Sequence, residues 1–169
     1  MVQYWIATSN WYRERVVGRP CSSAEQRNDR HIWWFDNVRD INIQVGDMVL
    51  VYQGGDNVEA RKEGIIIDNQ IKCCFIGNFT INRLDVGGCP GDNTDSHWHE
   101  TLERNFLWPP ERIFKRKSID DSLLVRAAGR PELKPRYVGL IFKDKTWIRL
   151  EERAGREYYE RVMQRRNHN

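Results

Sequence analysis

Residues Ile71–Asn82 read IKCCFIGNFTIN, a stretch in which apolar and polar side chains alternate almost strictly. Such alternation is typical of a β-strand with one buried and one open face, so we expect one alternate set of these side chains to be buried together. A strand of this length usually bends, and Gly77 at its middle is a natural place for a bend or a bulge. Long bent strands are typical of small barrels.

The sequence on either side predicts further short elements. The expected strands are Gln3–Thr8, Met48–Tyr52, Arg112–Ile119 and Tyr137–Phe142. The expected helices are Trp11–Val17, capped by Ser9 or Asn10, Asp121–Ala128, between a capping Asp120 and Gly129, and the amphipathic Arg156–Arg166. Residues 84–110 are rich in Gly, Asp, Asn and Pro and predict a long loop. Strands and helices do not alternate, so we expect a single α+β domain over 1–169, a small, mixed, mostly antiparallel β-barrel with peripheral helices.

The composition is that of a globular protein. Hydrophobic residues make up 40% of the 169 residues and charged residues 30%, and no apolar run approaches the length of a membrane span. We therefore expect a cytoplasmic protein. The net charge is only +3, but residues 104–149 hold 12 Lys/Arg against 5 Asp/Glu, which predicts one basic face.

The sequence gives little support for a catalytic site or a metal site. The four cysteines form no C-x-x-C pair, and Cys89, His97 and His99 are too few and too widely spaced to favour zinc. There is no G-x-S-x-G, P-loop or dinucleotide-binding motif. We expect no metal, no cofactor and no catalytic activity.

Several short motifs occur together in an order that resembles the EVE/YTH branch of the PUA-like superfamily. They are Tyr4-Trp5-Ile6 followed by Thr8-Ser9-Asn10, Ile32-Trp33, Val45-Gly46-Asp47 before an apolar strand ending at Tyr52, Phe75–Phe79 with its central glycine, and the closing segment from Phe142 to Met163. The match spans nearly the whole chain but departs from the family at residues 19–31 and 84–110. Proteins of this branch hold one nucleic-acid base, often a modified one; YTH members recognise N6-methyladenine in RNA, and EVE-like members are linked to modified DNA and to modification-dependent restriction.

The resemblance implies a site for a flipped, modified base. Trp33 matches the tryptophan that forms one wall of the family's aromatic pocket, and Asn10, with Ser9 beside it, matches the polar turn that reads the base edge. Trp34 occupies a position that is small in most relatives, and it is a further base-binding candidate that would either narrow the pocket or extend its wall. Adjacent strand residues point to opposite faces, so the rings of Trp33 and Trp34 cannot both lie on one face of the strand.

The remaining assignments come from the residues themselves. Trp98 and Trp108 lie in or beside the long loop and are candidates to close the aromatic cage, although packing in the core is the alternative for each. Arg112, Lys115, Arg116 and Lys117 are candidates to bind phosphates. The expected partner is DNA or RNA with a modified base. We expect no binding to a membrane, and a restriction or RNA-processing domain is a candidate protein partner. A small enzyme acting on nucleic acid and a protein-interaction domain with exposed tryptophans remain alternatives.

Overall fold

The structure is a computed structural model that describes residues 1–9, 32–35, 42–55, 70–86, 97–101, 107–143 and 147–168. At residue 9 and in 32–35, 82–86 and 97–101 it describes the backbone alone. The helix predicted over Trp11–Val17, and Asn10 itself, lie outside these residues. None of the described helices has the length and apolar character needed to span a bilayer.

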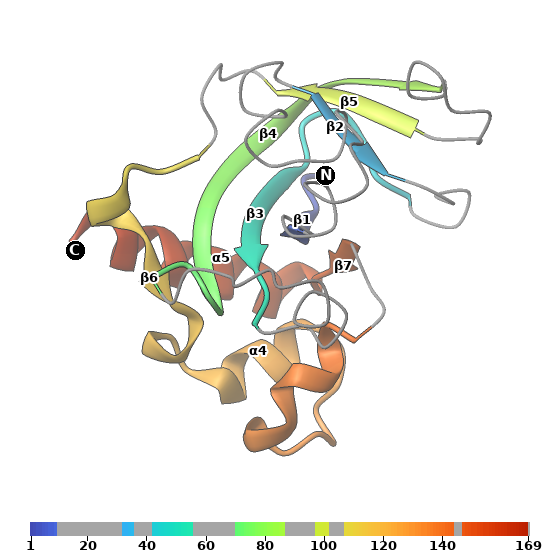
Figure 1. The fold of residues 1–169 in the computed structure, drawn as a ribbon. Helices are drawn as coiled ribbons and strands as arrows, with labels where there is room; N and C mark the ends of the chain where they lie inside the picture. The colour runs from blue at the N-terminus through green and yellow to red at the C-terminus, as the bar shows by residue number, and fades with distance from the viewer. Residues whose placement is uncertain are drawn as a thin grey trace, which may run out of the picture.

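Seven strands of the described residues form one mixed sheet (Figure 1). They are β1 (Tyr4–Ser9), β2 (Ile32–Phe35), β3 (Met48–Gln53), β4 (Cys74–Val86), β5 (His97–Thr101), β6 (Phe114–Lys115) and β7 (Trp147–Arg149). The order is β2-β5-β4-β3-β1-β7, with β6 also paired to β4. Only β1 and β3 run parallel, and the other pairs are antiparallel.

The expectation of a mixed, mostly antiparallel α+β fold is confirmed, but the predicted closed barrel is wrong. The outermost strands of the described sheet, β2 and β7, have no ladder between them. Closure requires the two edge strands to meet over several residues, and these edges have four and three residues. β5 also lies within the segment 84–110 that was expected to be a loop, because HWHET carries no apolar alternation that marks a strand.

The central strand β4 contains a bulge where the glycine predicted one. Val51 of β3 pairs with Gly77 and Tyr52 pairs with Phe75, which leaves Ile76 as the extra residue. The carbonyl oxygen of Ile76 accepts a hydrogen bond from the backbone N–H of Trp108 at 2.8 Å, so the polar group released by the bulge is satisfied.

The bulge also overturns the expected single alternation. An extra residue shifts the side-chain period by one, so Cys74 before the bulge and Ile76 within it share a core with Phe79 and Ile81 after it. The strand starts at Cys74 and not at Ile71, because Cys73 has a φ of 53°, in the left-handed region that a strand cannot include.

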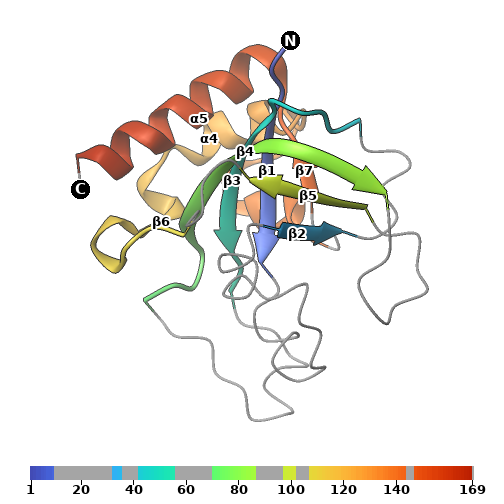
Figure 2. The ribbon, with the colours of Figure 1, turned by 90° about the horizontal axis from the view of Figure 1, so that it is seen from above.

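The sheet separates two cores, and the helices that the structure describes pack on one of them. The helix-side core contains the side chains of α4 (Asp121–Ala127), α5 (Glu152–Asn167) and the 3₁₀ segment η3 (Pro135–Ile141) that pack on β1, β3 and β4. The second core lies on the opposite sheet face and includes Trp5, Val49, Val51, Ile76 and Trp147. Figures 1 and 2 show α4 and α5 on one side of β3, while β2 and β5 cross over the other end of the sheet.

Both helices that fall within the described residues were predicted close to their true positions. The Asp120 carboxylate caps α4 by accepting from the Ser122 N–H at 2.9 Å, and Gly129 follows the helix with a φ of 71°. In α5 the predicted apolar stripe is buried at Tyr158, Tyr159 and Val162.

Two predicted strands are wrong because prolines set the local backbone. Pro109 and Pro110 lead into the 3₁₀ turn η1 (Pro110–Arg112), and a second turn, η2 (Arg116–Ser118), leaves only two strand residues between them. Pro135 likewise starts η3 in the segment predicted as the strand Tyr137–Phe142. The buried residues there, Val138 and Ile141, are three apart, which is the period of a 3₁₀ helix and not that of a strand.

Candidate nucleic-acid interface

The polar end of the first strand lies beside the end of β3. Because β1 and β3 are parallel, their carboxyl ends meet at the same edge, and Ser9 is the register partner of Gln53. Asn10 follows Ser9 in the chain but lies outside the described residues. The structure therefore adds Gln53 to the residues that the sequence placed at this turn.

Gln53 is a buried amide whose hydrogen bonding is incomplete. Its side chain belongs to a residue that is 1% exposed, on the same alternate set as Val49 and Val51 of the second core. Nε2 donates only to the carbonyl oxygen of Gly54, at 3.4 Å, and Oε1 has no partner among the described residues. A buried acceptor left unpaired costs about 1–3 kcal/mol, so such a group is expected either to be strained or to await a ligand.

The sequence itself contains a signal that singles out Gln53. The strand MVLVYQ has buried residues at every position after the first, and glutamine is the only strongly polar side chain among them. A polar residue at an inward position of an apolar strand is a reason to look for a site. The expected strand Met48–Tyr52 ends one residue before Gln53.

The tryptophans of β2 and β5 are placed by backbone register alone. Trp34 is the direct cross-strand partner of Trp98, and Trp33 is the partner of His99. The backbone register thus pairs Trp98 with Trp34 and not with Trp33.

Trp108 is a core residue in this structure. It is 6% exposed, its ring stacks on Phe114 at 5.9 Å, and its Nε1 donates to Asn78 Oδ1 at 2.7 Å. Asn78 Nδ2 in turn donates to the hydroxyl of Tyr159 at 3.3 Å, which ties β4 to α5. The guanidinium of Arg166 lies 5.4 Å from the Trp108 ring centre. These contacts leave the packing role as the one that the geometry supports.

Three of the four expected phosphate-binding residues make contacts within the protein. Arg112 Nη1 donates to the carbonyl oxygens of Arg166 and Asn167 at the end of α5, and Lys115 Nζ donates to the carbonyl oxygen of Lys72 at 2.6 Å. Arg116 is buried, and Lys117 is exposed. The basic segment thus stabilises turns and a helix end more than it forms a continuous cationic strip.

Arg116 is the centre of a buried polar cluster. Its Nη1 donates to the Tyr52 hydroxyl at 3.1 Å, and its Nε pairs with Asp121 Oδ1 at 3.2 Å. Burial raises the pKa of Tyr52 far above its ordinary value, and the nearby positive charge of Arg116 offsets this only in part. Burial also raises the pKa of Tyr158, whose hydroxyl has no partner among the described residues. This cluster fixes the end of β3 against α4.

The Val45-Gly46-Asp47 motif has a structural explanation. Gly46 has a φ of 93°, which favours glycine, and it turns the chain into β3. The Asp47 carboxylate is buried and accepts hydrogen bonds from the Gln3 N–H, the Gln44 N–H and Trp5 Nε1 at 2.9–3.1 Å. Asp47 therefore joins the starts of the parallel strands β1 and β3.

A hollow of about 400 Å³ lies elsewhere, at the start of α5. Its described lining consists of Glu152, Arg153 and Arg156, all charged and without an aromatic ring that a base requires for stacking. Among the residues that the structure describes, no three His, Cys, Asp or Glu side chains gather as metal ligands do.

Comparisons with known proteins add little. A scan against protein-family models and a search of curated proteins found no match. Among solved structures, the NMR structure of Rpa0253 from Rhodopseudomonas palustris is similar, with 12% sequence identity and a TM-score of 0.48 over 98% of this chain and 94% of that chain. A likeness at this level supports no conclusion about fold family or function.

Proposed function

We propose that this chain is a non-catalytic reader domain that holds one flipped, modified base of DNA or RNA beside the carboxyl ends of β1 and β3. The observation that carries the proposal is the buried, half-paired amide of Gln53 next to Ser9. The resemblance to EVE/YTH domains of the PUA-like superfamily points to the same turn, since it assigns the base edge to Ser9 and Asn10.

The chemistry of a base matches what Gln53 lacks. A carboxamide offers one acceptor and two donors in a plane, and a base edge presents complementary donors and acceptors in a plane. A ligand N–H would satisfy Oε1, and a ligand acceptor would replace the weak 3.4 Å bond from Nε2 to Gly54. Because the amide is already desolvated in the folded protein, the ligand would gain the bond without paying again to strip water from it.

The aromatic wall is assigned to Trp33. Stacking of a base on an indole contributes about 1–3 kcal/mol, and a methyl group on the base adds apolar contact worth a further 1–3 kcal/mol or so. Trp34 is the matched control on the same strand, since adjacent residues of a strand project to opposite faces. It pairs with Trp98, whereas Trp33 pairs with His99.

The test is a binding screen with single modified bases. Fluorescence anisotropy of labelled single strands, plain or carrying one N6-methyladenine or one 5-methylcytosine, is measured for the parent and for Trp33→Ala, Trp34→Ala and Gln53→Leu. We expect Trp33→Ala to weaken binding of the preferred strand by about 5- to 100-fold and Trp34→Ala to leave it near the parent value. Gln53→Leu should mainly reduce the preference among bases, because it removes an edge contact and leaves the stacking surface.

The result that rejects the proposal is binding by all folded variants that equals the parent's, or no binding by the parent. Thermal melts of each variant show that the fold is intact. Mass spectrometry of the recovered oligonucleotide separates a reader from an enzyme, because a reader returns the strand unchanged.

A further inference from the structure

The 3₁₀ segment η3 buries two of its apolar side chains and exposes two others. It is kinked at Tyr137, whose φ of −101° and ψ of 15° are not helical. Val138 and Ile141 are buried, whereas Tyr137 and Leu140 are 49% and 51% exposed. Lys134, Arg136 and Lys143 are exposed as well. We call the exposed residues Lys134, Arg136, Tyr137, Leu140 and Lys143 the η3 platform.

The charge on this part of the molecule is strongly positive. Residues 126–143 contain five Lys/Arg and one acidic residue, Glu132. Glu132 is already engaged, since Arg130 Nε donates to its Oε1 at 2.7 Å. Within the described residues, no ion pair engages Lys134, Arg136 or Lys143. The basic excess that the sequence assigned to residues 104–149 is therefore presented here, and less by Arg112–Lys117.

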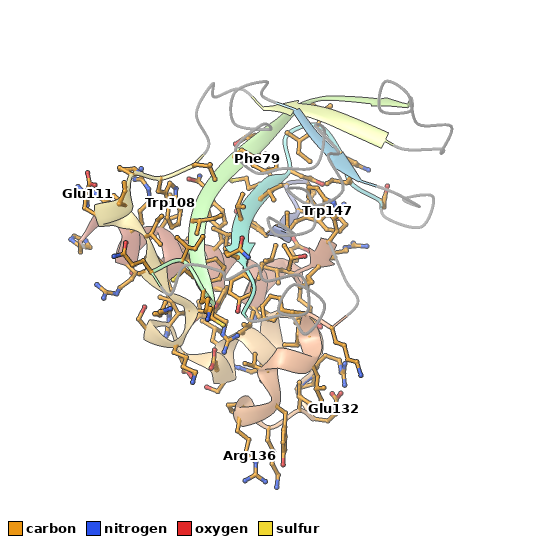
Figure 3. The ribbon with its side chains drawn as sticks, in the orientation of Figure 1. Phe79, Trp108, Glu111, Glu132, Arg136 and Trp147 are labelled. Atoms are coloured by element: carbon orange, nitrogen blue, oxygen red, sulfur yellow. The ribbon has the colours of Figure 1, made fainter. Side chains whose placement is uncertain are left out.

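An aromatic ring lies among these cations. The Arg136 guanidinium lies 4.8 Å from the Tyr137 ring centre, and about half of the tyrosine surface remains open to solvent. Figure 3 shows Arg136 projecting from the end of the molecule that lies farthest from β2 and β5. A partly open aromatic ring beside unpaired cations has the chemistry of a surface for single-stranded nucleic acid, in which bases stack and phosphates pair with Lys and Arg.

Phe142, the residue that follows η3, stacks on Tyr52 with ring centres 4.4 Å apart and planes 25° apart. Tyr52 lies in the helix-side core, whereas Gln53, the next residue of β3, faces the second core. The stack therefore fixes the end of η3 on the helix-side face of the sheet, and the η3 platform is a surface separate from the proposed base site.

We propose that the η3 platform binds the single-stranded segment that flanks the recognised base, with Tyr137 stacking on a neighbouring base and Lys134, Arg136 and Lys143 pairing with phosphates. This inference rests on the proposed function and adds to it a second contact surface outside the base site. An open aromatic ring among cations favours nucleic acid over an acidic protein segment, because a base can stack on the ring while phosphates pair with the cations.

The experiment compares two lengths of the same strand. Labelled single strands of about 6 and about 16 nucleotides, each with the preferred base at its centre, are titrated by fluorescence anisotropy at several salt concentrations. We expect Tyr137→Ala to weaken binding of the long strand by about 5- to 100-fold and to leave the short strand nearly unchanged, while Tyr137→Phe keeps parental binding. Arg136→Gln should reduce the salt slope for the long strand by about 1.

The matched control is Arg161→Gln, an exposed arginine on α5 that pairs with Glu157 and should leave both strands unaffected. The inference is overturned, and the reader function kept, if Trp33→Ala weakens both lengths while the Tyr137 and Arg136 variants bind as the parent does. If the Tyr137 and Arg136 variants lose binding of the long strand while Trp33→Ala binds as the parent does, the platform is supported and the proposed base site is rejected. If the parent binds neither strand, both proposals are overturned. If Tyr137→Ala abolishes binding of a labelled poly-glutamate peptide and leaves binding of both strands unchanged, the inference is also overturned, and the platform binds an acidic protein instead.

Discussion

Substitution of Asp47 by alanine tests whether the Val45-Gly46-Asp47 motif is structural. The carboxylate is 1% exposed and accepts three N–H groups, at 3.1 Å from Gln3, 2.9 Å from Gln44 and 3.0 Å from the Trp5 indole. Trp5 is itself fully buried, so the loss of its acceptor costs about 1–3 kcal/mol. The two backbone N–H groups are only partly buried and recover some hydration, which makes their loss about 0.5–1.5 kcal/mol each.

We therefore expect Asp47→Ala to lower the free energy of unfolding by about 3–4 kcal/mol, roughly the middle of that range. For a chain of this length the melting temperature should fall by about 6–16 °C. Urea denaturation followed by tryptophan fluorescence measures the loss, with an unchanged m-value as the sign that the native and unfolded states keep their exposed areas. Asp47→Asn keeps one acceptor oxygen and should lose less.

The control for this experiment is Asp120→Ala, which removes an exposed helix cap and should cost only about 1 kcal/mol. Equal losses at Asp47 and Asp120 would refute the assignment of Asp47 as the buried joint between β1 and β3. A structural Asp47 also predicts that Asp47→Asn, kept below its melting temperature, binds oligonucleotides as the parent does. A selective loss of binding without a loss of stability would show that the carboxylate contacts the ligand.

Three further predictions concern α5 and the buried tyrosines. Gly155→Ala should destabilise the protein by about 1–2 kcal/mol in thermal or urea unfolding. A Cβ at this position lies 2.6 Å from Leu150 Cβ, and the cost of this overpacking exceeds the gain in helix propensity. The control is Gly139→Ala, whose Cβ meets no atom within 4 Å and which should be neutral or slightly stabilising. Tyr158→Phe should stabilise by about 1 kcal/mol, because it removes a buried hydroxyl without a partner among the described residues, and a loss of stability would reveal a partner for that hydroxyl. The raised pKa values of Tyr52 and Tyr158 mean that the folded state keeps protons that the unfolded chain loses above pH 10 or so, so stability should fall as pH rises beyond that value, with a shallower fall in Tyr158→Phe.

Sequence patterns predicted the elements that carry a clear local signal. β1 and β3 are short runs of consecutive apolar residues, α4 has a capping aspartate and α5 has an apolar stripe, and each lies within a few residues of its expected position. In β4 the alternation correctly predicts a strand, but it does not predict which side chains are buried, because the bulge at Ile76 reverses the buried alternate set. A bulge can be suspected from a glycine, but its register depends on the partner strand and on Trp108, thirty residues further along the chain.

The predicted strands Arg112–Ile119 and Tyr137–Phe142 failed for a local reason. Each follows a proline that fixes φ and removes a backbone donor, and each satisfies its backbone within short turns. The burial of Arg116 has a distant cause, since its partners Tyr52 and Asp121 come from elements that only the tertiary fold brings together. Cationic residues in a sequence do not reveal which of them will be used internally.

The two surfaces that we assign to ligand both break the rules that the rest of the fold follows. Gln53 places an unsatisfied amide where Val49 and Val51 place apolar side chains, and Tyr137 and Leu140 place apolar side chains where a polar, basic segment faces solvent. Each violation reduces stability in isolation, by leaving a buried acceptor unpaired or an apolar surface hydrated. Proteins tolerate such conflicts mainly where a partner relieves them. The Tyr52–Phe142 stack belongs to the helix-side core while Gln53 faces the other core, so the two positions are separate surfaces. A nucleic-acid strand long enough to reach both would relieve both conflicts, with the edge of one base on Gln53 and another base on Tyr137.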